Sequence, residues 1–235
     1  METNFIVVAL DFPTEFEAFR VIDQLDPETC RGKIGKELFT RLGPSVVRRA
    51  VDAGFDVFLD LKYHDIPNTV AGACKAAAEL GCWMINAHAS GGRAMMEAAV
   101  EGLSHHRIRP LLVGVTVLTS MGRVAIEEVG YQETLEKLVL RLATLSRDCG
   151  LDGVVCSPHE IRPIKDRLGQ DFLTVTPGVR PPAASSDDQS RVATPAEARA
   201  AGGDYLVIGR PITRTANCRS AVAEIYAGIA DPNPN

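Results

Sequence analysis

The stretch "FLDLKYHDIPNTV" (residues 58–70) begins as an apolar strand and then acquires three charges, Asp60, Lys62 and Asp65. Side chains along a strand point alternately to its two faces. One face is apolar and suits packing against helices, and it is formed by Val57, Leu59 and Leu61. The opposite face ends in Asp60 and Lys62, while Asp65 falls on the loop beyond the strand. This strand is therefore expected to present charge at its carboxyl end.

Similar short apolar runs recur along the chain, and helical spacing follows each of them. The runs are residues 5–10, 32–39, 56–62, 83–89, 110–118, 152–157, 172–179 and 205–210. Eight strands alternating with helices predict an α/β fold, a (β/α)₈ TIM barrel that forms one catalytic domain over residues 1–230. A doubly wound open sheet is the alternative. Residues 231–235 are predicted to be a disordered tail.

The composition excludes several classes of protein. The 235 residues are 46% hydrophobic and 23% charged, and the net charge of -5 favours neither a nucleic-acid partner nor a membrane partner. Six cysteines without a C-x-x-C pair predict reduced, buried thiols. The first residues lack a basic region and a long apolar run, so a cytoplasmic location is expected.

The charged strand end predicts an active site, because barrel enzymes place their catalytic groups at the carboxyl ends of the strands. The alternative is that Asp60 and Lys62 form a structural ion pair. At ~4 Å and an effective dielectric of about 20, their attraction is about 4 kcal/mol before desolvation is subtracted. Apolar replacements often stabilise a core equally well, so a functional role is favoured.

Two further strand ends each place a glycine beside an arginine. "TPGVRP" (176–181) contains Gly178 and Arg180, and "IGRPIT" (208–213) contains Gly209 and Arg210. The loops after strands seven and eight of barrels commonly bind phosphate, and arginine supplies donors that match phosphate oxygens. The alternative is an ordinary turn with a surface arginine. The two pairs together predict a phosphorylated ligand.

The polar segment 181–191 lies between these two strand ends. Its composition is typical of a disordered surface loop, and its position suits a closing lid with Gln189 at its tip. The five histidines show no H-x-x-x-H or H-E-x-x-H spacing. No metal site is predicted.

Motifs along nearly the whole chain resemble the orotidine 5′-phosphate decarboxylase family, in particular its bacterial branch. The motifs are "VVALDF" (7–12), "KIGKELF", "FDVFLDLKYHDIPNTV", "HASGG", "VTVLTSM", "GLDGVVCS", "VTPGVRP" and "DYLVIGRPIT". The D-x-K-x-x-D core is also similar to 3-keto-6-phosphogulonate decarboxylase and hexulose-phosphate synthase. The continuation "IPNT" and the presence of "TPGVRP" favour the orotidylate enzyme.

The resemblance implies a homodimer with active sites shared across the interface. One subunit would supply Lys33, Asp60 and Lys62, and its neighbour would supply Asp65 and Thr69. Strand periodicity leaves open whether Lys33 or Lys36 faces inward, and the family pattern K-x-G-K selects Lys33. The substrate-binding residues implied by the resemblance are Asp11 and Lys33 for the ribose, Thr119 and Ser120 for the pyrimidine, and Arg180, Gln189, Gly209 and Arg210 for the phosphate.

The implied reaction is decarboxylation of orotidine 5′-monophosphate to UMP in pyrimidine biosynthesis, without metal or organic cofactor. Lys62 would stabilise the charge that forms at C6 and then protonate it, held in place by Asp60 and Asp65. A related sugar-phosphate lyase that uses Mg²⁺ is the second hypothesis. A catalytically silent barrel that binds a nucleotide or sugar phosphate is the third, although simple binding does not require this charged series.

Overall fold

Eight parallel strands pair in chain order and close into a barrel in the computed structural model, with β1 also bonded to β8. The structure describes residues 4–181 and 193–230. The strands are β1 (Ile6–Ala9), β2 (Arg31–Gly35), β3 (Val57–Tyr63), β4 (Met84–His88), β5 (Leu111–Val115), β6 (Gly153–Val155), β7 (Leu173–Thr176) and β8 (Tyr205–Ile208). The predicted (β/α)₈ barrel is confirmed, and the open sheet is wrong.

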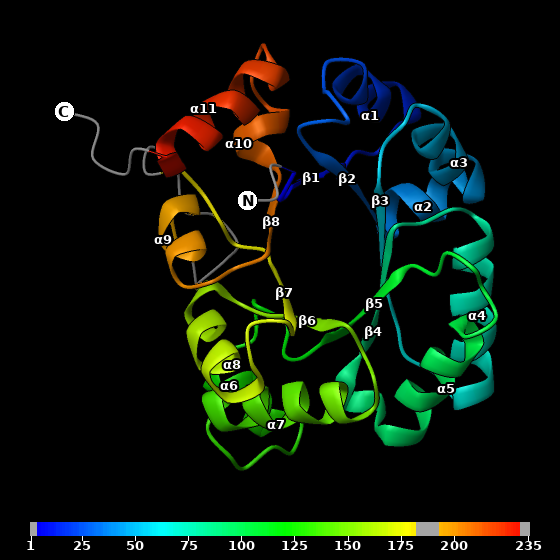
Figure 1. Ribbon diagram of the computed structural model, residues 1–235, viewed down its shortest axis with the longest axis vertical. Helices are drawn as coiled ribbons and strands as arrows, with labels where there is room; N and C mark the ends of the chain where they lie inside the picture. The colour runs from blue at the N-terminus through cyan, green and yellow to red at the C-terminus, as the bar shows by residue number, and fades with distance from the viewer. Residues whose placement is uncertain (1–3, 182–192, 231–235) are drawn as a thin grey trace.

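Helices surround the barrel on its outside (Figure 1). Within the described residues they are α1 (Glu15–Ile22), α2 (Lys36–Leu42), α3 (Pro44–Asp52), α4 (Pro67–Glu79), α5 (Arg93–Leu103), α6 (Arg123–Glu128), α7 (Leu135–Asp148), α8 (Ile161–Leu168), α9 (Pro195–Ala200), α10 (Arg210–Thr213) and α11 (Cys218–Ala230). Two short 3₁₀ turns, η1 (Ala89–Gly91) and η2 (Pro158–Glu160), precede α5 and α8. None of the described helices has the length and apolar character needed to cross a membrane.

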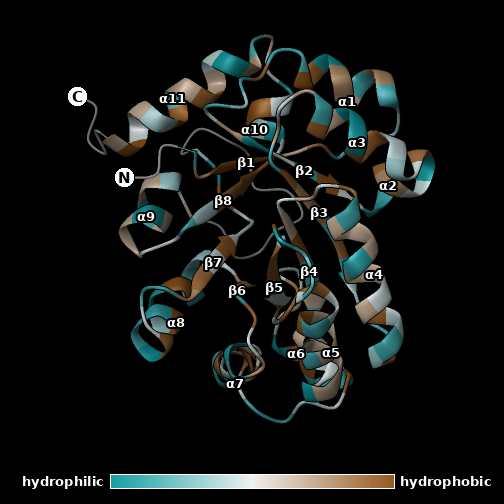
Figure 2. Ribbon diagram, turned by 45° about the vertical axis from the view of Figure 1, so that its right-hand side comes forward, coloured by the Kyte–Doolittle hydropathy of each residue, from teal (hydrophilic) through white to brown (hydrophobic). Residues whose placement is uncertain are grey.

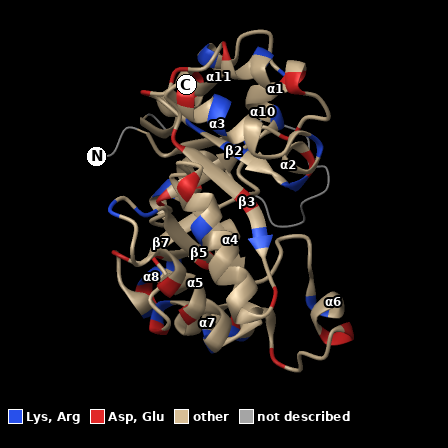
Figure 3. Cartoon of the chain, turned by 90° about the vertical axis from the view of Figure 1, so that its right-hand side faces the viewer, with Lys and Arg blue, Asp and Glu red and all other residues tan. Residues whose placement is uncertain are grey.

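The core follows from the alternation along each strand. The strands at the centre of the molecule are mostly hydrophobic, and the surrounding helices mix hydrophilic and hydrophobic residues (Figure 2). On β3, Val57 and Leu59 are fully buried on the outward face, as the alternation predicts. On the face that Figure 3 shows, acidic and basic residues are interspersed over the outer helices. All six cysteines are buried and unpaired, as predicted.

The second strand is shorter than the sequence suggested. β2 ends at Gly35 rather than at residue 39, because "KELFTRL" forms α2 from residues that favour helix. Lys36 therefore begins a helix and is exposed, whereas Lys33 is buried inside the barrel. A side chain at Gly35 would place its Cβ 2.9 Å from Oδ1 of Asp11. A larger residue at this position would crowd the atoms through which Asp11 and Lys33 meet.

Three predictions concern residues outside the described ranges. They are the phosphate-binding role of Gln189, the lid in the segment 181–191, of which residue 181 alone is described, and the tail at residues 231–235. They stay predictions.

Candidate active site

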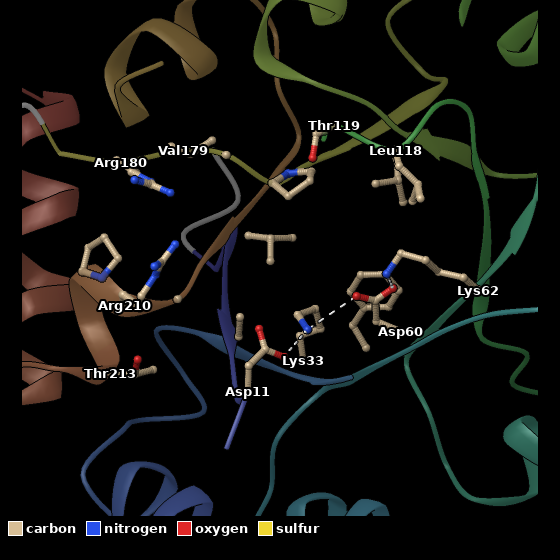
Figure 4. Close-up of a pocket in the computed structure, with 18 of the residues that line it drawn as sticks. Asp11, Lys33, Asp60, Lys62, Leu118, Thr119, Val179, Arg180, Arg210 and Thr213 are labelled. Carbon is tan, nitrogen blue, oxygen red and sulfur yellow. Dashed lines mark hydrogen bonds and ion pairs between the residues drawn. The ribbon is translucent and has the colours of Figure 1, made fainter. Parts of the chain in front are cut away.

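A cavity of about 620 Å³ opens at the carboxyl ends of the barrel strands (Figure 4). Eight of the residues predicted from the sequence line it, and they are Asp11, Lys33, Asp60, Lys62, Thr119, Arg180, Gly209 and Arg210. The figure shows Lys33, Asp60 and Lys62 on one side of the cavity and the two arginines on the other. The strand ends singled out separately in the sequence therefore face one common space.

Four residues form a charged network on one side of the cavity, and Asp60 lies at its centre. Oδ1 of Asp60 accepts a hydrogen bond from Nζ of Lys62 at 2.5 Å, and Oδ2 lies 3.4 Å from Nζ of Lys33. Nζ of Lys33 also donates to Oδ1 of Asp11 at 2.9 Å. The Asp60 side chain is 13% exposed and that of Lys62 is 24% exposed. Both side chains line the cavity, and that of Lys62 is the more exposed of the two.

Burial and the neighbouring charges shift the pKa values of Lys33 and Asp60 in opposite directions, and the combined effect of the charges is the larger. Burial alone would lower the pKa of Lys33, but attraction to Asp60 and Asp11 raises it above its ordinary value. Burial would raise the pKa of Asp60, yet Lys33 and Lys62 hold it below its usual range. Both groups are therefore charged at neutral pH. The cavity wall carries fixed, alternating charges of the kind that stabilise a charge developing during a reaction.

The backbone of Lys62 has an uncommon conformation. Its φ is 54°, and it is the one non-glycine residue in the described ranges with a positive φ. Such a conformation costs about 1–3 kcal/mol and persists only where the surroundings enforce it. Asn86 on β4 helps to hold the Lys62 backbone in this conformation, because its Oδ1 accepts a hydrogen bond from the Lys62 backbone N–H at 2.7 Å.

Asn86 is the site residue that sequence reasoning missed. It is fully buried, and its Nδ2 also donates to Oδ1 of Asp60 at 2.7 Å. A signal was present in the run "WMINAHA" (83–89), where a lone amide interrupts the buried strand. Buried amides are usually hydrogen-bonded, so an amide at this position indicates a polar partner nearby.

The opposite side of the cavity is formed by the ends of β7 and β8. Gly178 has φ 80°, a conformation that glycine adopts without strain, and the chain then places Val179 and Arg180 along the cavity. The Arg180 backbone N–H donates to the Ala193 carbonyl at 3.0 Å, so residues 180 and 193 lie next to each other. The guanidinium groups of Arg180 and Arg210 lie near each other on this side (Figure 4). We call these two residues the arginine pair.

Three of the predicted site residues do not line the cavity of this chain. Ser120 is exposed beyond β5, and Asp65 and Thr69 belong to an exposed run over residues 64–69. Oδ1 of Asp65 accepts a hydrogen bond from the Ile66 backbone N–H at 2.7 Å. The expectation that a neighbouring subunit supplies Asp65 and Thr69 is compatible with this exposure and stays a prediction.

Two histidines, His64 and His88, lie near the network. The rings of His64 and His88 lie 5.4 Å apart, and burial lowers the pKa of His88 to about 4, aided by His64 and nearby lysines. The described residues contain no group of three or more His, Cys, Asp or Glu side chains arranged to hold a metal ion. The carboxylate of Asp60 faces the two lysine ammonium groups instead.

Fold and site together define a (β/α)₈-barrel enzyme with a charged network facing an arginine pair across one cavity. A family model described as "Orotidine 5'-phosphate decarboxylase / HUMPS family" matches residues 4–225. The chain belongs to this family.

Relatives within the family are similar over almost their whole length. The orotidine 5′-phosphate decarboxylase of Nitrosococcus oceani is 53% identical over 98% of this chain and 100% of its own. That of Chromobacterium violaceum is 58% identical over 97% of this chain and 92% of its own. The crystal structure of orotidine 5′-phosphate decarboxylase from Lactobacillus acidophilus matches with a TM-score of 0.84 and 37% identity, covering 95% of this chain and 98% of that chain.

Proposed function

We propose that this protein decarboxylates orotidine 5′-monophosphate to UMP, with Lys62 as the catalytic acid. The observation that carries the proposal is the Lys62 ammonium, held 2.5 Å from Asp60 and facing the cavity. The arginine pair on the opposite side is suited to a phosphate group. A nucleotide would then lie with its phosphate at the arginine pair and its base at the charged network.

The reaction creates a charge that needs a fixed cation. When the bond between C6 and the carboxylate breaks, CO₂ leaves and the electron pair stays on C6 in the plane of the ring. The ring π system does not delocalise that pair, so a pre-positioned ammonium is the most direct stabilisation. Lys62 then gives one of its protons to C6, which yields UMP, and solvent returns a proton to the amine.

The other members of the network would hold this ammonium and the ribose. Asp60 keeps Lys62 oriented, and Lys33 neutralises the second oxygen of the same carboxylate. The contact of 2.9 Å between Nζ of Lys33 and Oδ1 of Asp11 supports assigning both groups to the ribose, because hydroxyls can accept from an ammonium and donate to a carboxylate. Thr119 lines the cavity beside apolar residues and is assigned to the pyrimidine.

Two observations favour the decarboxylase over a Mg²⁺-dependent sugar-phosphate lyase of the same family. The similar relatives, at 53% and 58% identity, are named orotidine 5′-phosphate decarboxylase. Both oxygens of Asp60 already face ammonium groups, which leaves that carboxylate poorly placed to bind a divalent cation. The test is product identity. The purified protein should convert orotidine 5′-monophosphate to equal amounts of CO₂ and UMP, and absence of either product would overturn the proposal.

The same proposal includes a homodimer in which each site takes Asp65 and Thr69 from the neighbouring subunit. What supports it is the exposed run at residues 64–69, which directly follows the strand that carries Asp60 and Lys62. Ile66, at the centre of this run, is 67% exposed, and an apolar side chain is stabilised when a partner covers it. A carboxylate arriving from a partner would add a second negative neighbour for Lys62.

We place the protein in the cytoplasm. The support is its cysteine chemistry, because all six thiols are buried and unpaired. Burial raises the pKa of Cys30 to about 11 and that of Cys74 to about 12, so these thiols stay protonated and unreactive.

Removing the Arg210 guanidinium should separate phosphate binding from chemistry at C6. Arg210→Ala is expected to lower kcat/KM for the nucleotide by about 10- to 10²-fold, because a charge-assisted hydrogen bond contributes about 1.5–3 kcal/mol. Orotidine, which lacks the phosphate, should be a poor substrate and should be nearly indifferent to the same change. Steady-state kinetics with both substrates provides the measurement. Equal losses with the two substrates would show that Arg210 does not act through the phosphate.

A further inference from the structure

We propose that Asn86 is a positioning residue that fixes both the backbone of Lys62 and the carboxylate of Asp60. The inference rests on the proposed decarboxylase function, because it assigns Asn86 a part in placing the catalytic ammonium. Neither the sequence motifs nor the charged network itself required this residue.

The first observation is an irregularity in the pairing of β3 with β4. Leu59 is paired with Ile85, and the next pair joins Tyr63 to Ala87. Three residues of β3, Asp60 to Lys62, therefore lie opposite a single residue of β4, which is Asn86. Bulges of this kind redirect side chains and are frequent beside active sites. The regular backbone ladder is interrupted at the point where the two catalytic residues project.

The second observation is that the Asn86 side chain forms hydrogen bonds where the backbone ladder between β3 and β4 is interrupted. Its Oδ1 accepts the hydrogen bond of the Lys62 backbone N–H at 2.7 Å. Its Nδ2 donates at 2.7 Å to Oδ1 of Asp60, the same oxygen that binds the Lys62 ammonium. One amide group thus joins the backbone of one catalytic residue to the side chain of the other.

An amide is the side-chain group suited to this position. It must accept a hydrogen bond at one end and donate one at the other, and Asn86 is fully buried, so water does not readily replace either partner. An aspartate of the same shape keeps the acceptor but lacks the donor when ionised. It would also bring a second negative charge against Asp60. Asn86→Asp therefore removes one of the two hydrogen bonds, and Asn86→Ala removes both.

The third observation is the left-handed conformation of Lys62, with φ 54°. A lysine adopts this conformation only where its surroundings hold it there. Loss of the Asn86 acceptor would leave the Lys62 N–H without that partner, and the backbone would relax toward a negative φ. The ammonium would then move away from its place beside Asp60. A displacement of about 1 Å in a catalytic group can reduce the rate by about 10²-fold.

The experiment compares Asn86→Ala and Asn86→Asp with the wild-type enzyme, using the conversion of orotidine 5′-monophosphate and the binding of UMP. Asn86→Ala should lower kcat by about 10²-fold, while the Kd for UMP changes by less than about threefold, because the arginine pair is untouched. Asn86→Asp should also lower kcat, since it loses the donor to Asp60. Its near-identical shape keeps the test available if the alanine variant does not fold.

Thr174→Val is the matched control for the loss of a buried polar group. Thr174 is fully buried on β7, and its hydroxyl donates to Asp204 Oδ2 at 3.0 Å, away from the cavity. We expect this variant to lower the melting temperature without changing kcat by more than about twofold.

Two results would overturn the inference. One is an active wild-type enzyme whose kcat is unchanged, within about threefold, by both Asn86 substitutions. The other is a parallel loss of kcat and UMP affinity, which would indicate general structural damage. A wild-type protein without decarboxylase activity would instead overturn the proposed function, so the two failures are distinguishable.

Discussion

Replacing Lys62 by alanine should lower kcat for orotidine 5′-monophosphate by at least about 10⁴-fold. The estimate combines two effects, since loss of one electrostatic donor costs about 10²–10³-fold and loss of a general acid about 10²–10⁴-fold. The Lys62 ammonium lines the cavity and donates to Asp60 at 2.5 Å, the shorter of the two lysine contacts of that carboxylate. The measurement is kcat from steady-state kinetics, with the Kd for UMP determined separately by calorimetry.

The binding measurement and a control variant make this prediction specific. UMP affinity should be largely retained in Lys62→Ala, because the arginine pair and the pairing of Lys33 with Asp11 are unaffected. Lys137→Ala, which removes an exposed lysine on α7 outside the cavity, should leave kcat unchanged. A Lys62→Ala enzyme that keeps more than about 1% of wild-type kcat would contradict the assigned role.

Mixing two inactive variants should restore activity if the sites are shared between subunits. Lys62→Ala and Asp65→Ala homodimers are each expected to lose at least about 10²-fold in kcat, since each lacks a group beside the reacting carbon. After random exchange, about half of the dimers are mixed, and one of their two sites contains both intact residues. The mixture should therefore recover about a quarter of the wild-type activity.

Subunit exchange has to be verified independently, for example with two differently tagged variants that are purified together. A mixture of the wild-type and Lys62→Ala proteins controls for losses caused by the exchange procedure. If exchange is complete and the mixture is no more active than its parents, Asp65 does not reach the neighbouring site. The exposed run at residues 64–69 would then have another role.

Alternation along the strands predicted much of the site. Phe58 lines the cavity from the regular part of β3, and its inward parity could be read from the sequence. The same parity predicted Asp60 and Lys62 on the cavity side, where they lie, but it did not predict the irregular backbone that carries them there. The arginine pair was also predictable, since it follows strands that converge at one end of the barrel. The sequence pattern of one strand is enough to predict a site residue when the direction of its side chain depends only on that strand.

Two features that depend on more than one strand's own pattern could not be predicted in the same way. The end of β2 at Gly35 depends on residues 36–42 preferring a helix over an extended strand, and parity alone did not distinguish Lys33 from Lys36. The bulge opposite Asn86 depends on the register between β3 and β4, which no single strand encodes. Asn86 was missed because its partners become visible only when that register is known.

The most direct test of the account is the ultraviolet absorbance of orotidine 5′-monophosphate over time, with purified protein and excess EDTA. We expect a decay to the spectrum of UMP that is unaffected by the chelator and abolished in Lys62→Ala. Such a result would establish decarboxylation that depends on the lysine and not on a chelatable metal. A flat trace from folded wild-type protein, or activity that appears only when Mg²⁺ is restored, would contradict it.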